Sequence, residues 1–463
     1  MHRLTACEIA AQVRQRRISA LSTMAHFLDR TARHEPQLNT YAALDAEGAL
    51  AAAREIDRRI AAGEDPGPLA GVPVSVKDLI AVQGLPQAFG SRLFAGSLAA
   101  HDAPSVARIR QAGGCIVGKT TTSELGSKAV GSSPLTGTTV NPWRPAHTPG
   151  GSSAGAAAGV AAGLVPLALG TDGGGSIRIP ASFCGLVGIK GSYGRVPVWP
   201  ASATPGLAHV APLARTVRDA VLLFSVVAGP HPGDPSSEGF APLRWEEGAH
   251  ATPGLRLGWC EDFSYGWASG EARAAAWHAA GVLGAALGAA TSRWQGLADD
   301  PVEAWSTEFY RGIAQRVGVA DGADRAIEAQ LDPALAAQIA LTRERGRQGL
   351  REASEARQRC IADIDRAFER FDLLLMPTTP VAAFETGRDA PAGREACGAV
   401  GWSYFTYPFN LAGHPAASYP IGLDCGGLPL GVQLVARRGD EALLFDALLA
   451  LERAAPPPPL PSF

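Results

Sequence analysis

Two clusters of glycine and serine, separated by a run of very small residues, constrain the fold of this chain more than any other feature. The first cluster is GGSSAG at 150–155 and the second is GGGS at 173–176. Between them, an alanine- and glycine-rich stretch and the apolar segment 166–170 predict a helix followed by a strand. Because small side chains let a helix pack closely on a sheet, we expect both clusters at one edge of a buried sheet.

The same alternation of helix and short apolar strand recurs along the chain and predicts the fold class. Segments 71–80 and 115–119 are apolar and rich in β-branched residues, and a helical pattern lies between them at 105–114. Further buried strands are expected at 371–380 and 430–436. Helices that alternate with buried strands indicate an α/β fold in which helices cover a sheet.

The region from about 230 to 370 has a different pattern. It contains helical periodicity at 271–290 and 335–370 and no cluster of reactive side chains. We expect it to be a helical insertion or cap within a single domain that spans 1–463. The proline-rich end at 455–463 is expected to be an extended tail.

Composition restricts the partners and the environment. Charged residues make up 18% of the chain and the formal net charge is −3, so there is no electrostatic case for nucleic acid or an anionic membrane as partner. Seven cysteines without a CxxC spacing predict free thiols and a cytoplasmic location. The first residues lack the apolar core of a signal peptide. The uncharged run 154–170 contains Pro166 and many small residues, so we interpret it as helix and strand rather than a membrane span.

The second cluster has the composition of an acyl-transfer site. Acyl transfer needs a nucleophile, a base and N–H donors directed at the developing oxyanion. Ser176 follows three glycines, whose backbone can turn its N–H groups inward, and is therefore the candidate nucleophile. The N–H groups of Gly173, Gly174 and Gly175, together with that of Ser176, are the candidate oxyanion hole.

The candidate base is a lysine. The ten histidines are scattered, and His147, His209 and His414 are interpreted as loop or packing residues. Lys77 ends an apolar strand, where desolvation favours the uncharged amine. The sequence has no cluster of metal-ligating residues and no phosphate-binding loop motif, so we expect no metal and no cofactor.

Several motifs together resemble the amidase signature family. The resemblance covers roughly 5–230 and 370–453 and implies a large mixed, twisted β-sheet between layers of α-helices. It also implies hydrolysis of carboxylic amide C–N bonds through an acyl-serine intermediate, with release of ammonia or an amine. The matching motifs are GVPVSVKDLI at 71–80, GKTTTSELG at 118–126, the long stretch 132–196, VAPLARTVRDA at 210–220, MPTTP at 376–380, YPFNLAGHPAASYPIG at 407–422 and GVQLVA at 431–436.

The family uses a Ser–cisSer–Lys triad, which maps by motif position onto Ser176, Ser152 and Lys77. The resemblance implies a cis peptide bond between Gly151 and Ser152 and a proton relay from Ser176 through Ser152 to Lys77. The choice of Ser152 over the neighbouring Ser153 depends on the resemblance alone.

Three further residues are expected to support this triad. Asp172 and Arg178 are predicted to form an ion pair that braces the glycine loop. Ser153 is predicted to support the triad by hydrogen bonding.

Two other functions stay open at this point. One is the glutamine-hydrolysing A-type subunit of a tRNA amidotransferase, which would need a permanent partner protein; the region 300–370 does not resemble the tyrosine-rich segment of that subfamily. The other is a catalytically inactive family member that acts as a binding protein, against which the intact triad argues. The substrate is expected to be a small-molecule amide, and a homodimer is left open.

Overall fold

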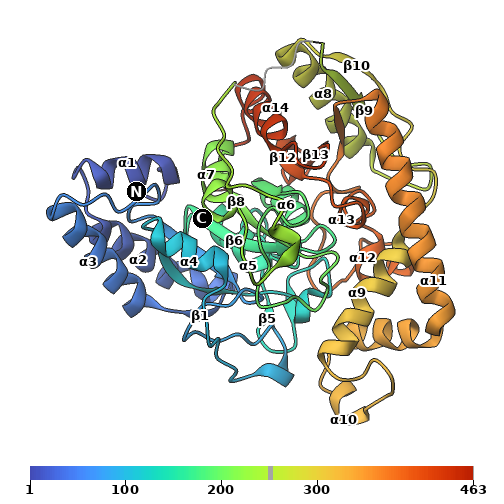
Figure 1. Ribbon diagram of the computed structural model, residues 1–463, viewed down its shortest axis with the longest axis horizontal. Coiled ribbons are helices and arrows are strands. Elements are labelled where there is room, and N and C mark those ends of the chain that lie inside the picture. Colours follow the sequence, from blue (N-terminus) through green and yellow to red (C-terminus); the bar gives the residue numbers. More distant parts are fainter. Residues whose placement is uncertain (249–253, 462–463) are drawn as a thin grey trace.

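The computed structural model describes residues 1–248 and 254–461, and a mixed β-sheet of eleven strands forms the centre of this part of the chain (Figure 1). The strand order is β1-β3-β2-β6-β8-β7-β12-β13-β11-β9-β10. The strands are β1 (Tyr41–Leu44), β2 (Pro73–Lys77), β3 (Cys115–Thr120), β6 (Leu167–Asp172), β7 (Val187–Lys190), β8 (His209–Ala214), β9 (Arg256–Trp259), β10 (Ala290–Arg293), β11 (Leu373–Pro377), β12 (Ala416–Leu423) and β13 (Pro429–Ala436); β4 (Ser132–Ser133) and β5 (Gly137–Thr138) pair separately.

The sheet is parallel in two blocks and antiparallel between them. β2 pairs in parallel with both β3 and β6, and β9 pairs in parallel with both β10 and β11. The strands from β6 through β8, β7, β12 and β13 to β11 pair antiparallel, as does β1 with β3. The predicted α/β fold with a large mixed sheet is confirmed.

Helices flank this sheet. α4, α7, α14 and α8 contact one another in a row along it, while α5 and α6 pack together against its central strands. The helices are α1 (Ala6–Arg14), α2 (Ala20–Leu38), α3 (Ala46–Ala61), α4 (Pro104–Gln111), α5 (Ala154–Ala161), α6 (Arg178–Cys184), α7 (Val217–Val227), α8 (Gly270–Leu287), α9 (Val302–Arg316), α10 (Arg325–Glu328), α11 (Pro333–Arg370), α12 (Gly398–Gly401), α13 (Pro408–Leu411) and α14 (Glu441–Ala454).

The small-residue segment folds as its composition predicts. Every residue of α5 is buried, and α5 contacts β6 and β2, because alanine and glycine allow the helix axis to approach the sheet closely. The segment from α5 to β6 is thus a helix and a strand. In the described part of the chain, no helix has the length and apolarity that a bilayer crossing requires.

The region 230–370 contributes helices and also two strands to the sheet. α9, α10 and α11 lie together on the side of the molecule away from α1, α2 and α3 (Figure 1). β9 and β10 extend the sheet beyond β11, which the sequence did not predict. All four residues of β10 are exposed, so this edge strand lacks the apolar pattern by which a strand is recognised.

Candidate active site

Lys77 is the last residue of β2, and its amine is enclosed by hydroxyl groups. All five residues of β2 are buried, because β3 and β6 pair with its two edges and α5 packs against the strand. Lys77 Nζ lies 2.7 Å from Ser152 Oγ, 2.9 Å from Ser153 Oγ and 2.9 Å from Thr171 Oγ1. No carboxylate among the described residues lies within ion-pair distance of this amine.

This environment favours the uncharged form of the lysine. Burial lowers the pKa of Lys77 well below its ordinary value, because desolvation penalises the ammonium form. The charge of Asp172 acts in the opposite direction and is the smaller influence. A neutral amine has a lone pair that can accept a proton, so Lys77 can act as a base.

The hydrogen bonds of Ser153 restrict which hydroxyl can deliver that proton. Ser153 Oγ donates to the Thr171 carbonyl oxygen at 3.1 Å and accepts from the Thr171 N–H at 3.3 Å. A hydroxyl has one proton, so Ser153 receives a hydrogen bond from Lys77 and does not give one. The lone pair of Lys77 is therefore left for Ser152 or Thr171, whose hydroxyl protons have no other acceptor among the described residues.

Glycines before Ser152 bring the two Gly/Ser clusters together. Gly150 has φ +78°, and the Gly151–Ser152 peptide bond is cis, as the resemblance implies. A Cβ on Gly151 would lie 2.3 Å from the carbonyl oxygen of Val130, so the backbone passes through a space that fits only glycine. The next N–H, of Ser153, donates to the carbonyl oxygen of Ser176 at 3.2 Å.

The carbonyl groups of the glycine loop are held by neighbouring side chains. Trp305 Nε1 donates to the carbonyl oxygen of Gly173 at 2.8 Å, and Thr406 Oγ1 donates to that of Gly174 at 2.6 Å. A Cβ on Gly174 would lie 2.6 Å from the Trp305 ring. In a trans peptide, N–H and C=O point in opposite directions. The carbonyl group of Gly173 and the N–H of Gly174 belong to the same peptide group. Because Trp305 holds this carbonyl, the N–H of Gly174 points away from the indole.

One N–H group of the predicted oxyanion hole, that of Gly175, is not free to bind an oxyanion. The N–H of Gly175 donates to Asp172 Oδ1 at 2.8 Å and is occupied. The N–H groups of Gly173, Gly174 and Ser176 meet no acceptor within residues 1–248 and 254–461. The donors available to an oxyanion are therefore those of Gly173, Gly174 and Ser176.

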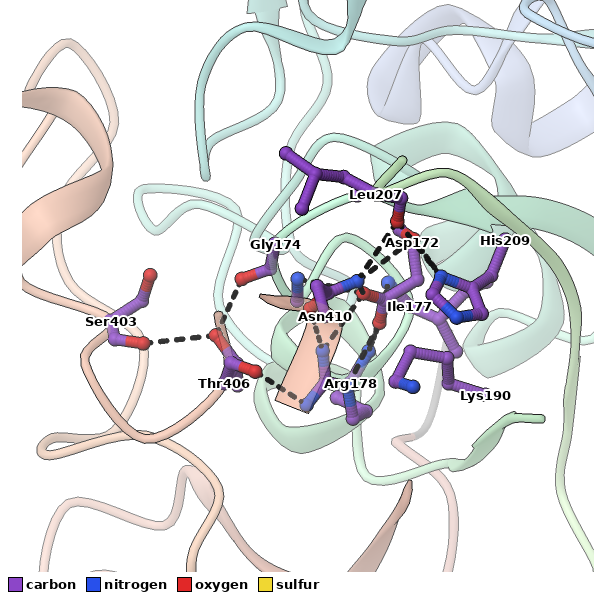
Figure 2. A network of polar contacts seen from close by, with 12 residues as sticks. Asp172, Gly174, Ile177, Arg178, Lys190, Leu207, His209, Ser403, Thr406 and Asn410 are labelled. Atoms are coloured by element: carbon purple, nitrogen blue, oxygen red, sulfur yellow. Dashed lines mark hydrogen bonds and ion pairs between the residues drawn. The ribbon is translucent and has the colours of Figure 1, made fainter. Parts of the chain in front are cut away.

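A buried ion pair lies directly behind the glycine loop (Figure 2). Arg178 Nη2 lies 2.8 Å from Asp172 Oδ1, and Arg178 Nε donates to Asp172 Oδ2 at 2.9 Å. The remaining Arg178 donors reach Asn410 Oδ1, Gln433 Oε1 and the carbonyl oxygen of Thr406. Burial alone would raise the pKa of Asp172, but the charge and hydrogen bonds of Arg178 outweigh it and hold this pKa well below its usual range. The predicted pair is thus present and fully hydrogen-bonded.

A cavity of about 240 Å³ opens in front of these groups. Ser152, Ser176, Thr171 and Gly173 form its polar end. Most of the remaining wall is apolar, with three aromatic side chains. Its lining includes Leu79, Ile80, Ala81, Gln87, Phe89, Leu125, Gly126, Pro197, Val198, Trp199, Pro200, Ala201, Ala203, Thr204, His209, Val210, Phe309 and Arg316. A substrate that enters this cavity meets both serines.

The histidines within residues 1–248 and 254–461 form no hydrogen bond with the two candidate catalytic serines. His209 was expected in a loop but begins β8, where it borders the cavity. Its Nδ1 lies 2.8 Å from the carbonyl oxygen of Leu207 and 3.1 Å from that of Asp172 (Figure 2). Burial lowers the pKa of His209 well below its ordinary value. No ring nitrogen in the described part of the chain forms a hydrogen bond with Ser152 or Ser176.

Sequence reasoning missed several residues of this site. Thr171 looks like an ordinary β-branched strand residue, and Trp305 is an aromatic residue in a helix far along the chain. Asn410 and Gln433 lie inside the matched C-terminal motifs, so a polar residue in an apolar segment was the signal that could have found them.

The comparisons with known proteins agree with this geometry. The sequence family described as Amidase matches residues 22–445. The chain belongs to the amidase signature family.

Relatives in this family resemble the chain along nearly their whole length. An acylamidase of Rhodococcus erythropolis is 34% identical, with 98% of this chain and 96% of that protein covered. The A-type subunit of the glutamyl-tRNA(Gln) amidotransferase of Acidothermus cellulolyticus is 37% identical, with 98% and 94% covered. The structure of a 6-aminohexanoate cyclic dimer hydrolase superposes with a TM-score of 0.86 at 31% identity and covers 98% of both chains. The chain is thus an amidase-type hydrolase.

Proposed function

We propose that this amidase hydrolyses small-molecule carboxylic amides through an acyl-enzyme on Ser176, with Ser152 and Lys77 as the proton relay. The observation that carries the proposal is the short distance, 2.7 Å, between the buried Lys77 amine and Ser152 Oγ. Ser152 and Ser176 border the same cavity, so a proton that leaves Ser176 has a hydroxyl close to the base to receive it.

The reaction proceeds in two halves. Ser176 Oγ attacks the amide carbonyl carbon while its proton passes to Ser152 and the Ser152 proton passes to Lys77. The N–H groups of Gly173, Gly174 and Ser176 stabilise the oxyanion. The C–N bond then breaks as the relay returns the proton to the leaving nitrogen, which departs as ammonia or an amine. Water attacks the acyl-serine ester by the same relay and releases the carboxylic acid.

The remaining residues of the site have positioning roles in this proposal. Ser153 orients the Lys77 amine by accepting its hydrogen bond. Asp172, neutralised by Arg178, holds the N–H of Gly175 and so fixes the curvature of the glycine loop.

The other function that the relatives favour is glutamine hydrolysis as part of a tRNA amidotransferase. Several curated relatives with 34–37% identity are A-type subunits of glutamyl-tRNA(Gln) amidotransferases. We place this function second, because the cavity wall is largely apolar and aromatic, whereas glutamine carries an amine and a carboxylate close to its amide. Release of ammonia from glutamine by the isolated chain, or only after a partner protein is added, would favour it.

The experiment for the main proposal combines labelling and turnover. A fluorophosphonate probe should label the native chain and not Ser176→Ala, because only an activated serine is phosphonylated. A screen of aliphatic, aromatic and urea-like amides, with detection of the released amine, should find turnover that Ser176→Ala lacks. A chain that is neither labelled nor active would instead support the inactive binding protein.

Location and assembly are further parts of this proposal. All seven cysteines are free thiols, which supports a reducing, cytoplasmic environment. Light scattering coupled to size-exclusion chromatography tests the homodimer.

A further inference from the structure

Arg316 is the one side chain with a formal charge among the described residues that line the active-site cavity. It is the last residue of α9, and its side chain is exposed, so its guanidinium is open to solvent at the cavity wall. The titratable groups near the serines, Lys77 and Asp172, are buried behind the lining. An isolated cation on a largely apolar wall requires an explanation.

The geometry of α9 places Arg316 at a distance from the serines. Phe309, Gly312 and Arg316 follow a spacing of three and four residues and therefore share one face of the helix. A Cβ on Gly173 would touch the Phe309 ring at 3.0 Å, so the Phe309 end of this face adjoins the glycine loop. Seven residues correspond to about 10 Å along a helix, so the backbone of Arg316 lies about that far along α9 from Phe309, which adjoins the reacting end of the cavity.

The loop before β8 packs against this face of α9. A Cβ on Gly312 would lie 2.0 Å from the carbonyl oxygen of Ala203, so helix and loop are in direct backbone contact. Beyond this contact, Arg316 Nη1 lies 3.5 Å from the carbonyl oxygen of Ala201, which is a weak hydrogen bond. The same cavity borders both serines and Arg316, so it extends from the serines to the guanidinium.

The guanidinium is positioned but not neutralised. Its central carbon lies 5.2 Å from the centre of the Phe89 ring, which also lines the cavity. Phe89 itself is held by a 2.8 Å hydrogen bond from the N–H of Leu125 to its carbonyl oxygen. No carboxylate of residues 1–248 or 254–461 forms an ion pair with Arg316. Apart from the weak bond of Nη1 to Ala201, its donors therefore remain available for an anion.

We propose that Arg316 is a specificity-determining residue that binds an anionic group, a carboxylate, at the end of the substrate remote from the scissile amide. This inference rests on the proposed function. The preferred substrate class is an amide with an apolar body that crosses the aromatic part of the cavity and carries a carboxylate about 10 Å from the reacting carbonyl. A guanidinium matches a carboxylate because its N–H groups form two parallel hydrogen bonds with the two oxygens.

The test uses mono-4-nitroanilides of straight-chain dicarboxylic acids, from four to ten carbons, and 4-nitroanilides of monocarboxylic acids of the same lengths. Release of 4-nitroaniline gives kcat and KM. We expect kcat/KM to favour the dicarboxylic compound at one intermediate length. Arg316→Gln should lower kcat/KM for that compound about tenfold, mainly through KM, and change the neutral partner less than twofold, as expected for loss of one charged hydrogen-bonded pair. Arg316→Lys should keep part of the preference.

Arg311→Gln is the matched control, because it removes the same charge from the same helix at a position that does not line the cavity. It should leave both substrate series unchanged. An equal loss on dicarboxylic and neutral compounds in Arg316→Gln would mean that Arg316 only packs on Phe89, and would overturn the proposal. The proposal would also be overturned if the native enzyme had equal kcat/KM for the dicarboxylic and the neutral compounds.

Titration calorimetry of the same compounds with Ser176→Ala measures their binding in the absence of turnover, and so tests the anion site directly. Tighter binding of the dicarboxylic compound, lost in the double variant with Arg316→Gln, supports the inference even where hydrolysis is slow. Equal binding of both series overturns it. Failure of the proposed function is distinguished from these results, since it would appear as absent fluorophosphonate labelling of Ser176.

Discussion

Ser153 Oγ donates its hydrogen bond to the carbonyl oxygen of Thr171, and this single contact determines how the Lys77 amine is used. With its proton engaged, Ser153 can only accept from Lys77. The lone pair of the amine is then left for Ser152 or Thr171. Two adjacent serines in one sequence cluster thus have different hydrogen-bond partners, and the proposed function gives them different roles.

Substitution of the three hydroxyl residues around Lys77 should separate these roles. Ser152→Ala should lower kcat about 10²–10⁴-fold, because it removes a group that transfers a proton in the transition state. Ser153→Ala and Thr171→Val should each lower it about tenfold or less, since each removes one hydrogen bond that positions the amine. Steady-state kinetics on one amide substrate measures all three. A larger loss in Thr171→Val than in Ser152→Ala would assign the relay to Thr171.

The rate should fall on the acid side of its pH profile. Burial lowers the pKa of Lys77, so the uncharged base is populated at lower pH than for an ordinary lysine. As pH falls through that lowered pKa, Lys77 takes up a proton and kcat/KM declines; as pH rises, the base is restored. Lys77→Met should be nearly inactive and should lack this limb. Circular dichroism over the same range excludes unfolding as the cause, and a rate that does not change between about pH 5 and 9 would contradict a neutral lysine base.

Removal of the buried arginine should destabilise the fold. Arg178→Met leaves the Asp172 carboxylate buried and unpaired, which should lower the free energy of unfolding by about 3–5 kcal/mol. Urea denaturation measures the change. The control is Arg33→Met, because the Arg33–Asp29 pair is exposed on α2 and such pairs contribute about 0–1 kcal/mol. Equal changes in the free energy of unfolding for the two variants would show that the buried pair does not stabilise the fold.

A methyl group on the glycine loop should disturb the oxyanion donors. A Cβ on Gly174 would lie 2.6 Å from the Trp305 ring, so Gly174→Ala must displace the loop or the indole. We expect kcat to fall about 10²-fold or more, which is typical when one oxyanion donor is lost. Gly281→Ala is the control: its Cβ would meet no atom within 4 Å, and in the interior of α8 it should stabilise the fold by up to about 1 kcal/mol. Unchanged kcat in Gly174→Ala would remove this loop from the proposed site.

Much of the fold could be predicted from local pattern. α1 begins with a capping box, in which the Thr5 side chain accepts from the N–H of Glu8 and the Glu8 side chain accepts from the N–H of Thr5. Buried strands such as β2 and β13 follow apolar, β-branched runs, because central strands bury both faces. The edge strand β10 and its neighbour β9 were missed, since both are short and an edge strand needs only backbone pairing, which leaves little apolar signal.

The sequence by itself determined the family, the α/β architecture, and the candidates Lys77, Ser152 and Ser176, because these depend on residue types in a fixed order. Only the tertiary structure decided which donors and acceptors are free. The N–H of Gly175 is occupied by Asp172, and the proton of Ser153 is occupied by Thr171. Arg316 joins the cavity from a helix far along the chain. Hydrogen bonds are made between groups that folding brings within about 3 Å, and sequence order does not specify that distance.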